Sequence, residues 1–175
     1  MKIVITGGPC SGKSTIISEL KNRGFKIIDE TAREVINDRN LDSNMTRDDS
    51  ISIQHEIILR QIEKEKVIDG SFEIYFLDRG IFDVYAYYLH LTGRIPEDMP
   101  FVESEKYAAV FALEPIKFVK DNARREDDAE ALEIHEKILE AYIAQGYTLI
   151  NVPVMDVEKR AGYILSVVDD LKKEF

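Results

Sequence analysis

The chain has 175 residues, of which 45% are hydrophobic and 32% charged, so its size and composition are those of one ordinary globular domain spanning residues 1–175. Its formal net charge of −10 repels the phosphates of nucleic acids and of anionic lipids, and we expect no nucleic acid and no membrane as a partner. A single cysteine, an N-terminal segment without signal-peptide architecture and the lack of an apolar run of about 20 residues predict a soluble, cytoplasmic protein.

Short β-branched runs alternate along the chain with segments of helical periodicity. In chain order the pattern predicts strand 2–6, helix 14–23, strand 26–29, helix 31–38, helix 46–67, strand 73–77, helix 82–91, strand 107–113, helix 129–145, strand 147–152 and helix 157–173. Thr46, followed three residues later by Asp49, predicts a capping box at the start of the longest helix. Residues 39–45 are polar and predict a mobile loop that serves as a lid or a substrate flap.

This alternation predicts an α/β fold with a parallel sheet. Parallel neighbours need crossover connections, and these connections cover both faces of the sheet. We expect the first strand to be central, because ligands of such sheets bind at the carboxyl edge where the strand order reverses. The strongest motif of the sequence directly follows that strand.

This motif, residues 7–14, reads GGPCSGKS and matches the phosphate-loop pattern G-x-x-x-x-G-K-[ST] between a predicted strand and a predicted helix. Glycines let backbone amides curl around a phosphate, and the helix amino terminus adds partial positive charge. The motif predicts that Lys13 bridges the β- and γ-phosphates of a nucleotide and that Ser14 coordinates Mg²⁺. The predicted nucleotide-binding residues of this segment are Gly8, Pro9, Cys10, Ser11, Gly12, Lys13, Ser14 and Thr15.

Polar residues follow the second and third predicted strands, at the same edge of the sheet. Asp78 is a candidate for the magnesium shell, and Arg79 for a second phosphate or an acceptor substrate. The alternative is that Asp78 caps the next helix and Arg79 is a surface charge. Glu30 is a candidate to orient or deprotonate an attacking hydroxyl, with Arg33 one turn further on facing the same cleft. Its alternative role is to favour a helix start through the helix dipole.

Two later segments provide further candidates. Arg124 and Arg125 follow the fourth predicted strand and can stabilise the charge of a transferring phosphoryl group as part of a lid. The alternative is that they pair with the acidic residues 126–128 beside them. Val152 and Pro153, after the fifth predicted strand, form a stiff turn against which a nucleotide base can lie, or simply a connecting turn.

Segments 7–14, 30–36, 78–80, 124–127 and 152–154 together resemble the family of predicted ATPases and kinases related to the kinase domain of NadR-type nicotinamide riboside kinases. More distantly the chain is similar to thymidylate and deoxynucleoside kinases. The resemblance implies a three-layer P-loop NTPase fold with a five-stranded parallel sheet in the kinase-type order 2-3-1-4-5. It also implies that Glu30 lies on the acceptor side, Asp78 and Arg79 at magnesium and phosphate, and Arg124 with Arg125 in a lid.

These features support two hypotheses. The first is an ATP- and Mg²⁺-dependent phosphotransferase whose small-molecule acceptor, a nucleoside, a nucleotide or a related metabolite, binds under residues 54–60. The second is an ATPase or switch protein that hydrolyses ATP or GTP and moves loop 39–47 without such an acceptor. No N-K-x-D motif for guanine is present, which favours ATP. The sequence leaves open whether the chain forms a homodimer.

Overall fold

The computed structural model of the chain describes residues 1–39, 46–68, 73–95, 99, 107–116 and 125–173. Its strands are β1 (Lys2–Thr6), β2 (Lys26–Ile28), β3 (Tyr75–Asp78), β4 (Ala109–Leu113) and β5 (Leu149–Val152). Its helices are α1 (Lys13–Asn22), α2 (Thr31–Asp38), α3 (Arg47–Val67), α4 (Ile81–Thr92), α5 (Arg125–Ala144) and α6 (Val157–Leu171). Each of these elements overlaps a predicted one, and the strand and helix types agree.

In the described part of the chain the strands form one parallel sheet in the order β2-β3-β1-β4-β5, which confirms the predicted α/β fold and its central first strand. The main difference in bounds is at α5, which begins at Arg125 rather than at residue 129. Residues 126–128 are acidic, and acidic residues in a first turn favour a helix through its dipole.

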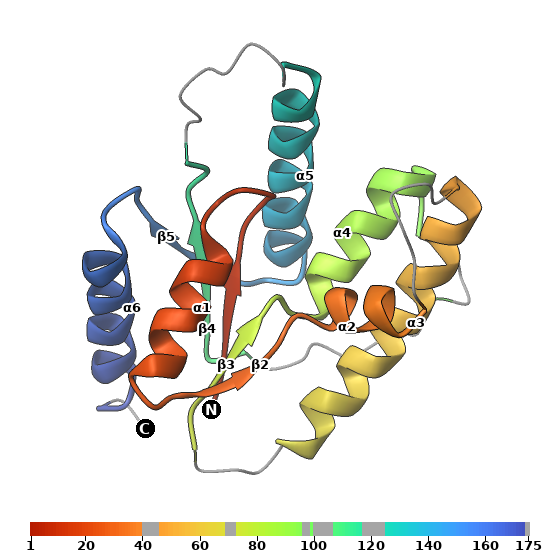
Figure 1. Cartoon of the computed structure of the whole chain (residues 1–175). Coiled ribbons are helices and arrows are strands. Elements are labelled where there is room, and N and C mark those ends of the chain that lie inside the picture. The colour runs from red at the N-terminus through yellow and green to blue at the C-terminus, as the bar shows by residue number, and fades with distance from the viewer. Residues whose placement is uncertain (40–45, 69–72, 96–98, 100–106, 117–124, 174–175) are drawn as a thin grey trace.

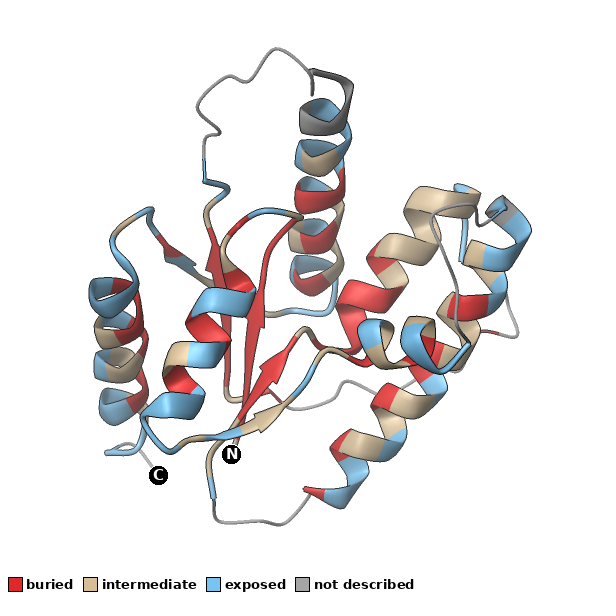
Figure 2. Ribbon diagram, viewed as in Figure 1, coloured by how far each residue is buried: buried red, intermediate tan, exposed pale blue. Residues whose placement is uncertain are grey.

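Helices cover both faces of the sheet (Figure 1). Successive side chains of a strand point to opposite faces, so Ile3 and Ile5 of β1 pack in one apolar cluster with α1 and α6. Val4, between them, packs in the opposite cluster with α4 and α5. Figure 2 shows the consequence: the central strands β1 and β4 are buried between two helical layers, whereas the edge strands β2 and β5 are more exposed. This is why the central strands consist of apolar, mainly β-branched and aromatic residues rather than alternating with polar ones.

Helices α2, α3 and α4 form a third apolar cluster beside the sheet, on the right in Figure 1. The predicted capping box opens α3: the Asp49 amide donates to Thr46 Oγ1 at 3.1 Å, and the Thr46 amide donates to Asp49 Oδ2 at 3.0 Å. The three helices lie next to the carboxyl ends of β1, β2 and β3: α2 follows β2, α4 follows β3, and Asp83 of α4 accepts a hydrogen bond from Thr6 at the end of β1. Among the described residues, no helix combines the length and the apolar character needed to span a membrane.

Candidate active site

The segment between β1 and α1 is a tight loop with several left-handed backbone positions. Gly7, Cys10 and Gly12 have φ values of +140°, +59° and +86°. Gly8 has another requirement: a Cβ at this position would lie 2.7 Å from the Cβ of His135 on α5. The glycines of the motif therefore let the backbone curl and let a neighbouring helix approach it.

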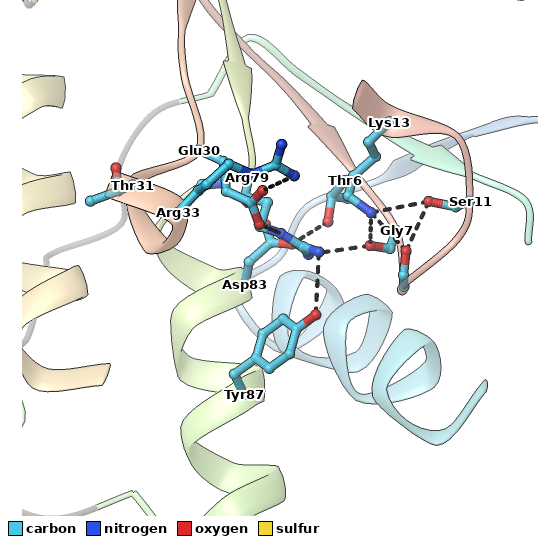
Figure 3. Close-up of polar contacts among 12 residues, drawn as sticks. Thr6, Gly7, Ser11, Lys13, Glu30, Thr31, Arg33, Arg79, Asp83 and Tyr87 are labelled. Carbon is cyan, nitrogen blue, oxygen red and sulfur yellow. Dashed lines mark hydrogen bonds and ion pairs between the residues drawn. The ribbon is translucent and has the colours of Figure 1, made fainter. Parts of the chain in front are cut away.

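Lys13 lies inside this curl (Figure 3). Its Nζ donates to the carbonyl oxygens of Gly7 and Gly8, both at 2.7 Å, and to Ser11 Oγ at 3.1 Å. Within the described residues it forms no ion pair with a carboxylate. Burial and the positive charge of Arg79 lower the pKa of Lys13 to about 7. An anionic phosphate in the loop would favour the charged form of this amine and would replace carbonyl acceptors that carry no net charge.

Two side chains that the motif does not contain hold the loop from outside. The Gly8 amide donates to His135 Nδ1 at 3.0 Å. Arg160 of α6, only 2% exposed, donates to four carbonyl oxygens, those of Ser11, Glu114, Val152 and Pro153, at 2.7, 2.9, 3.2 and 2.8 Å. Sequence reasoning missed both residues, because they are distant from the motif in the chain and no local pattern marks them.

The predicted base-binding residues, Val152 and Pro153, do not belong to the phosphate loop: Val152 ends β5 and Pro153 follows it. The Val152 side chain is fully buried in the core cluster that β5 shares with α1 and α6. Pro153 follows it, and its carbonyl accepts from Arg160. Neither residue lines the cavity at the phosphate loop. Contact of this turn with a base therefore stays a prediction.

Arg79 is the centre of the polar contacts at the carboxyl edge (Figure 3). Its φ of +74° is unusual for a residue that has a Cβ. Nε donates to Glu30 at 2.9 Å, Nη1 to Asp83 at 3.1 Å and to the Gly7 carbonyl at 3.3 Å, and Nη2 to the Tyr87 hydroxyl at 3.2 Å. The alternative reading of this arginine as a surface charge is wrong, since the side chain is only 14% exposed.

Glu30 comes from the end of the β2 segment and lies at the N-cap position of α2. Its Oε1 accepts from Arg79 at 2.9 Å, and its Oε2 lies 3.2 Å from Nη2 of Arg33. Burial alone would raise the pKa of Glu30, but the positive charges of Arg79, Arg33 and Lys13 together outweigh burial and hold the pKa below its usual value. This carboxylate is therefore ionised at neutral pH.

Asp78 is the last residue of β3 and is buried. Its Oδ1 atom has no hydrogen-bond partner in the described structure. Burial and the neighbouring charge of Glu30 raise the pKa of Asp78 to about 6. The alternative that Asp78 caps α4 is wrong, because Gly80 is the N-cap and its amide donates to Asp83 Oδ2 at 3.0 Å.

Asp83 is a central residue of the site that sequence reasoning did not identify. Its Oδ1 accepts from Thr6 at 2.6 Å and from Arg79, and its Oδ2 accepts from the Gly80 amide and from the Tyr142 hydroxyl at 2.6 Å. It thereby ties β1, the turn after β3 and α5 together. The one signal in the sequence was its position: Asp83 is the third residue of α4, a position where an acidic side chain often accepts from the backbone amide of the N-cap residue.

Two cavities adjoin at this edge of the sheet. The loop cavity, about 490 Å³, is lined by Pro9, Cys10, Ser11, Gly12, Lys13, Ser14, Thr15, Glu30, Arg33, Arg79 and Ile116. The side cavity, about 370 Å³, lies among α2, α3, α4 and α5, and its polar lining includes Gln54, Tyr87 and Asp83. Glu30 and Arg79 line both cavities.

The structure thus brings most of the predicted site residues together around these cavities. Gly8 contributes through its backbone, and Ser14 and Thr15 lie exposed in the first turn of α1. Arg124 and most of loop 39–45 lie outside the described residues. Arg125 opens α5, but its side chain is outside the described part, so the role of both arginines in a lid stays a prediction.

The fold and the loop define a P-loop protein of the three-layer α/β type, with the sheet order of P-loop kinases. The chain belongs to the family described as AAA domain, whose family model matches residues 2–160. No curated protein matches the sequence.

Solved structures similar to this chain include kinases and a NadR protein. A deoxyadenosine kinase from M. mycoides has 18% identity and a TM-score of 0.65, covering 97% of this chain and 100% of that one. A NadR protein in complex with NR has 17% identity and a TM-score of 0.67, covering 97% of this chain and 50% of that one. A thymidylate kinase from Ehrlichia chaffeensis has 13% identity and a TM-score of 0.61, covering 96% and 98%. At these identities the likeness shows the fold.

Proposed function

We propose that this protein is an ATP- and Mg²⁺-dependent phosphotransferase that acts on a small molecule with a hydroxyl acceptor. The observation that carries the proposal is the contact between the two cavities at Glu30 and Arg79. A protein that only binds or hydrolyses a nucleotide needs the loop cavity alone. A second, partly apolar cavity that opens next to the phosphate loop suits an acceptor held for in-line transfer.

The loop cavity is the proposed donor site. Its backbone curl and the amino terminus of α1 offer hydrogen-bond donors and partial positive charge to a polyphosphate. Lys13 is already inside the curl and is free of carboxylates among the described residues, so exchanging its contacts with Gly7 and Gly8 for phosphate oxygens breaks no ion pair. Its charge would then lie where charge develops during transfer.

The residues present fit a magnesium ion. Asp78 Oδ1 is buried and has no hydrogen-bond partner in the described structure, and such an oxygen is costly unless a cation or a cation-bound water meets it. We assign Asp78 and the Ser14 hydroxyl to this ion. When bound, the ion would neutralise negative charge on the phosphates.

Glu30 is the proposed partner of the acceptor hydroxyl. It is ionised, lines both cavities, and is oriented by two arginines. In the transfer step the acceptor oxygen forms a bond to the γ-phosphorus, the bond from that phosphorus to the leaving ADP breaks, and the hydroxyl proton passes to the Glu30 carboxylate. Arg124 and Arg125 are proposed to cover the phosphates from the segment before α5, as the sequence predicts.

The similar solved structures support this proposal because they include a deoxyadenosine kinase with bound dATP and a NadR protein in complex with NAD and AMP-PNP. The test is to mix the protein with ATP, Mg²⁺ and a panel of nucleosides, nucleotides and riboside-type metabolites, and to measure ADP release. Release that an acceptor accelerates, with a phosphorylated product in mass spectrometry, supports the phosphotransferase. Release that no acceptor accelerates would instead support an ATPase or switch protein.

A further inference from the structure

The side cavity carries an excess of negative charge. Among the described residues that line it, the acidic side chains are Glu30, Asp83 and Glu130, and the one basic side chain is Arg79, so acids outnumber bases by three to one. A phosphate monoester carries about −1.5 to −2 charges near neutral pH. Entering this cavity would bring such a group close to carboxylates in a partly buried place, where solvent screens charges poorly.

Arg79 is not available to compensate that charge. Its guanidinium already donates to Glu30, Asp83, Tyr87 and the Gly7 carbonyl, and two of these partners are carboxylates. With only 14% of the side chain exposed, it cannot turn toward a new anion without giving up these bonds. Its positive charge is thus used to orient Glu30 and to hold the turn after β3.

Two other groups that could attract a phosphate, the first amides of α4 and the ring of His90, already have partners within the protein. The first amides of α4 point to partners in the protein, since Gly80 donates to Asp83 at 3.0 Å and Ile81 donates to the Tyr107 hydroxyl at 2.9 Å. His90, which lines the cavity, lies 3.3 Å from Glu130 and 3.5 Å from Glu133. The ring also lies 3.4 Å from Lys137 Nζ through its Nδ1, so both ring nitrogens have partners within the protein.

The remaining walls of the side cavity are apolar with a few hydrogen-bonding groups. Ile53, Ile57 and Val84 are buried, with exposed fractions of 2%, 2% and 6%. Gln54 adds an amide, and the Tyr87 ring carries the Arg79 guanidinium on its face, 5.2 Å from its centroid. These walls suit a compact molecule with an apolar or planar body and hydroxyl groups.

We propose that the acceptor of the side cavity carries no phosphate group and is an uncharged or positively charged hydroxyl compound. The inference rests on the proposed function and names the class of acceptor within it. Transfer itself adds negative charge to the acceptor, because the product is a phosphate monoester and ADP leaves. The lining that admits the acceptor therefore repels the product, which favours product release.

A binding experiment tests this class without turnover. The phosphate loop is first filled with a nonhydrolysable ATP analogue and Mg²⁺, so that a monophosphate cannot bind there. Calorimetry then compares adenosine, cytidine, thymidine and nicotinamide riboside with their 5′-monophosphates. We expect at least one compound to bind and its monophosphate to bind at least tenfold more weakly, with the difference shrinking as salt is added. Equal or tighter binding of the monophosphates, or binding of no compound in the panel, would overturn the inference.

Turnover with the same pairs separates this inference from the proposed function. If monophosphates accelerate ADP release more than their parent compounds do, the phosphotransferase stands and the inference fails. If a parent compound binds in calorimetry but none accelerates ADP release, the class of ligand stands and the phosphotransferase fails.

A charge reversal sharpens the test. Glu130→Lys adds a cation at the cavity rim, where the side chain is 63% exposed, and we expect it to tighten monophosphate binding several-fold with little change for the uncharged compound. Glu136→Lys makes the same change on an exposed position of α5 that does not line the cavity, and it should leave both affinities unchanged. The same response from both variants would mean that the cavity lining does not set the discrimination.

Discussion

The two cavities that adjoin at Glu30 and Arg79 are built from different parts of the chain. The loop cavity owes its shape to the backbone: one segment curls tightly, and Arg160 and His135 hold it through main-chain atoms. The side cavity is lined mainly by side chains from α2, α3, α4 and α5. A protein built in this way can keep its donor constant while its acceptor varies, and substitutions on the two sides should have different effects.

The largest effect is expected at the loop. Lys13→Ala removes the one basic side chain inside the curl, and we expect ADP release with any acceptor to fall about a thousandfold, since the charge on the transferring group loses its fixed partner. Steady-state kinetics with ATP and Mg²⁺ measures this. Lys21→Ala, on the exposed side of the same helix, is the matched control and should keep its activity. Activity within tenfold of the parent would remove Lys13 from the mechanism.

The next effect concerns the attachment of the loop. Arg160→Leu removes a donor from four carbonyl oxygens, of which that of Val152 keeps another, the Glu114 amide at 3.0 Å. We expect the free energy of unfolding to fall by about 3 kcal/mol and nucleotide affinity to fall with it. Denaturant unfolding and calorimetry measure the two quantities. Lys159→Gln, its neighbour on α6 with 75% exposure, should change stability by less than about 0.5 kcal/mol. Similar stability of both variants would show that Arg160 is dispensable for the fold.

The difference between contacts that are local in the chain and contacts between distant segments explains what the sequence could predict. Residues 7–14 lie together in the chain, so a local pattern is enough to predict the loop, and the helical and strand periodicities predicted the sheet and the helices that frame it. Asp83, His135 and Arg160 act through contacts 77, 127 and 149 residues away in the chain. A single sequence does not show which segments face each other at such separations, and each of these residues also suits an ordinary helix position.

On the acceptor side the largest effect is expected at Glu30. Glu30→Gln keeps the size of the side chain and an oxygen for Arg79, but it removes the charge that we propose accepts the hydroxyl proton. We expect the transfer rate to fall about a hundredfold while ATP affinity stays nearly unchanged, as single-turnover kinetics and calorimetry would measure. Glu34→Gln, on the same helix but outside both cavities, is the control. An unchanged transfer rate would reduce Glu30 to a residue of the helix start.

The smallest effect is expected at Arg33, which differs from Arg79 although both contact Glu30. Arg33 is 66% exposed, and solvent screens such an ion pair, whereas Arg79 is 14% exposed and has four partners. Arg33→Gln should therefore lower the rate less than threefold at pH 8. Both arginines hold the pKa of Glu30 below its usual value, so losing one raises that pKa.

The raised pKa of Glu30 should shift the acid limb of the pH profile in one direction only. Because the ionised carboxylate is the proposed proton acceptor, the Arg33→Gln variant should lose activity at a higher pH than the parent as the solution is acidified, with an unchanged plateau on the alkaline side. The measurement is the acid limb of kcat/KM against pH. Arg23→Gln, which breaks the ion pair with Glu19 on α1, is the control and should leave the limb in place. An acid limb that moves to lower pH in the Arg33 variant, or moves equally in both variants, would mean that Arg33 does not set the ionisation of Glu30.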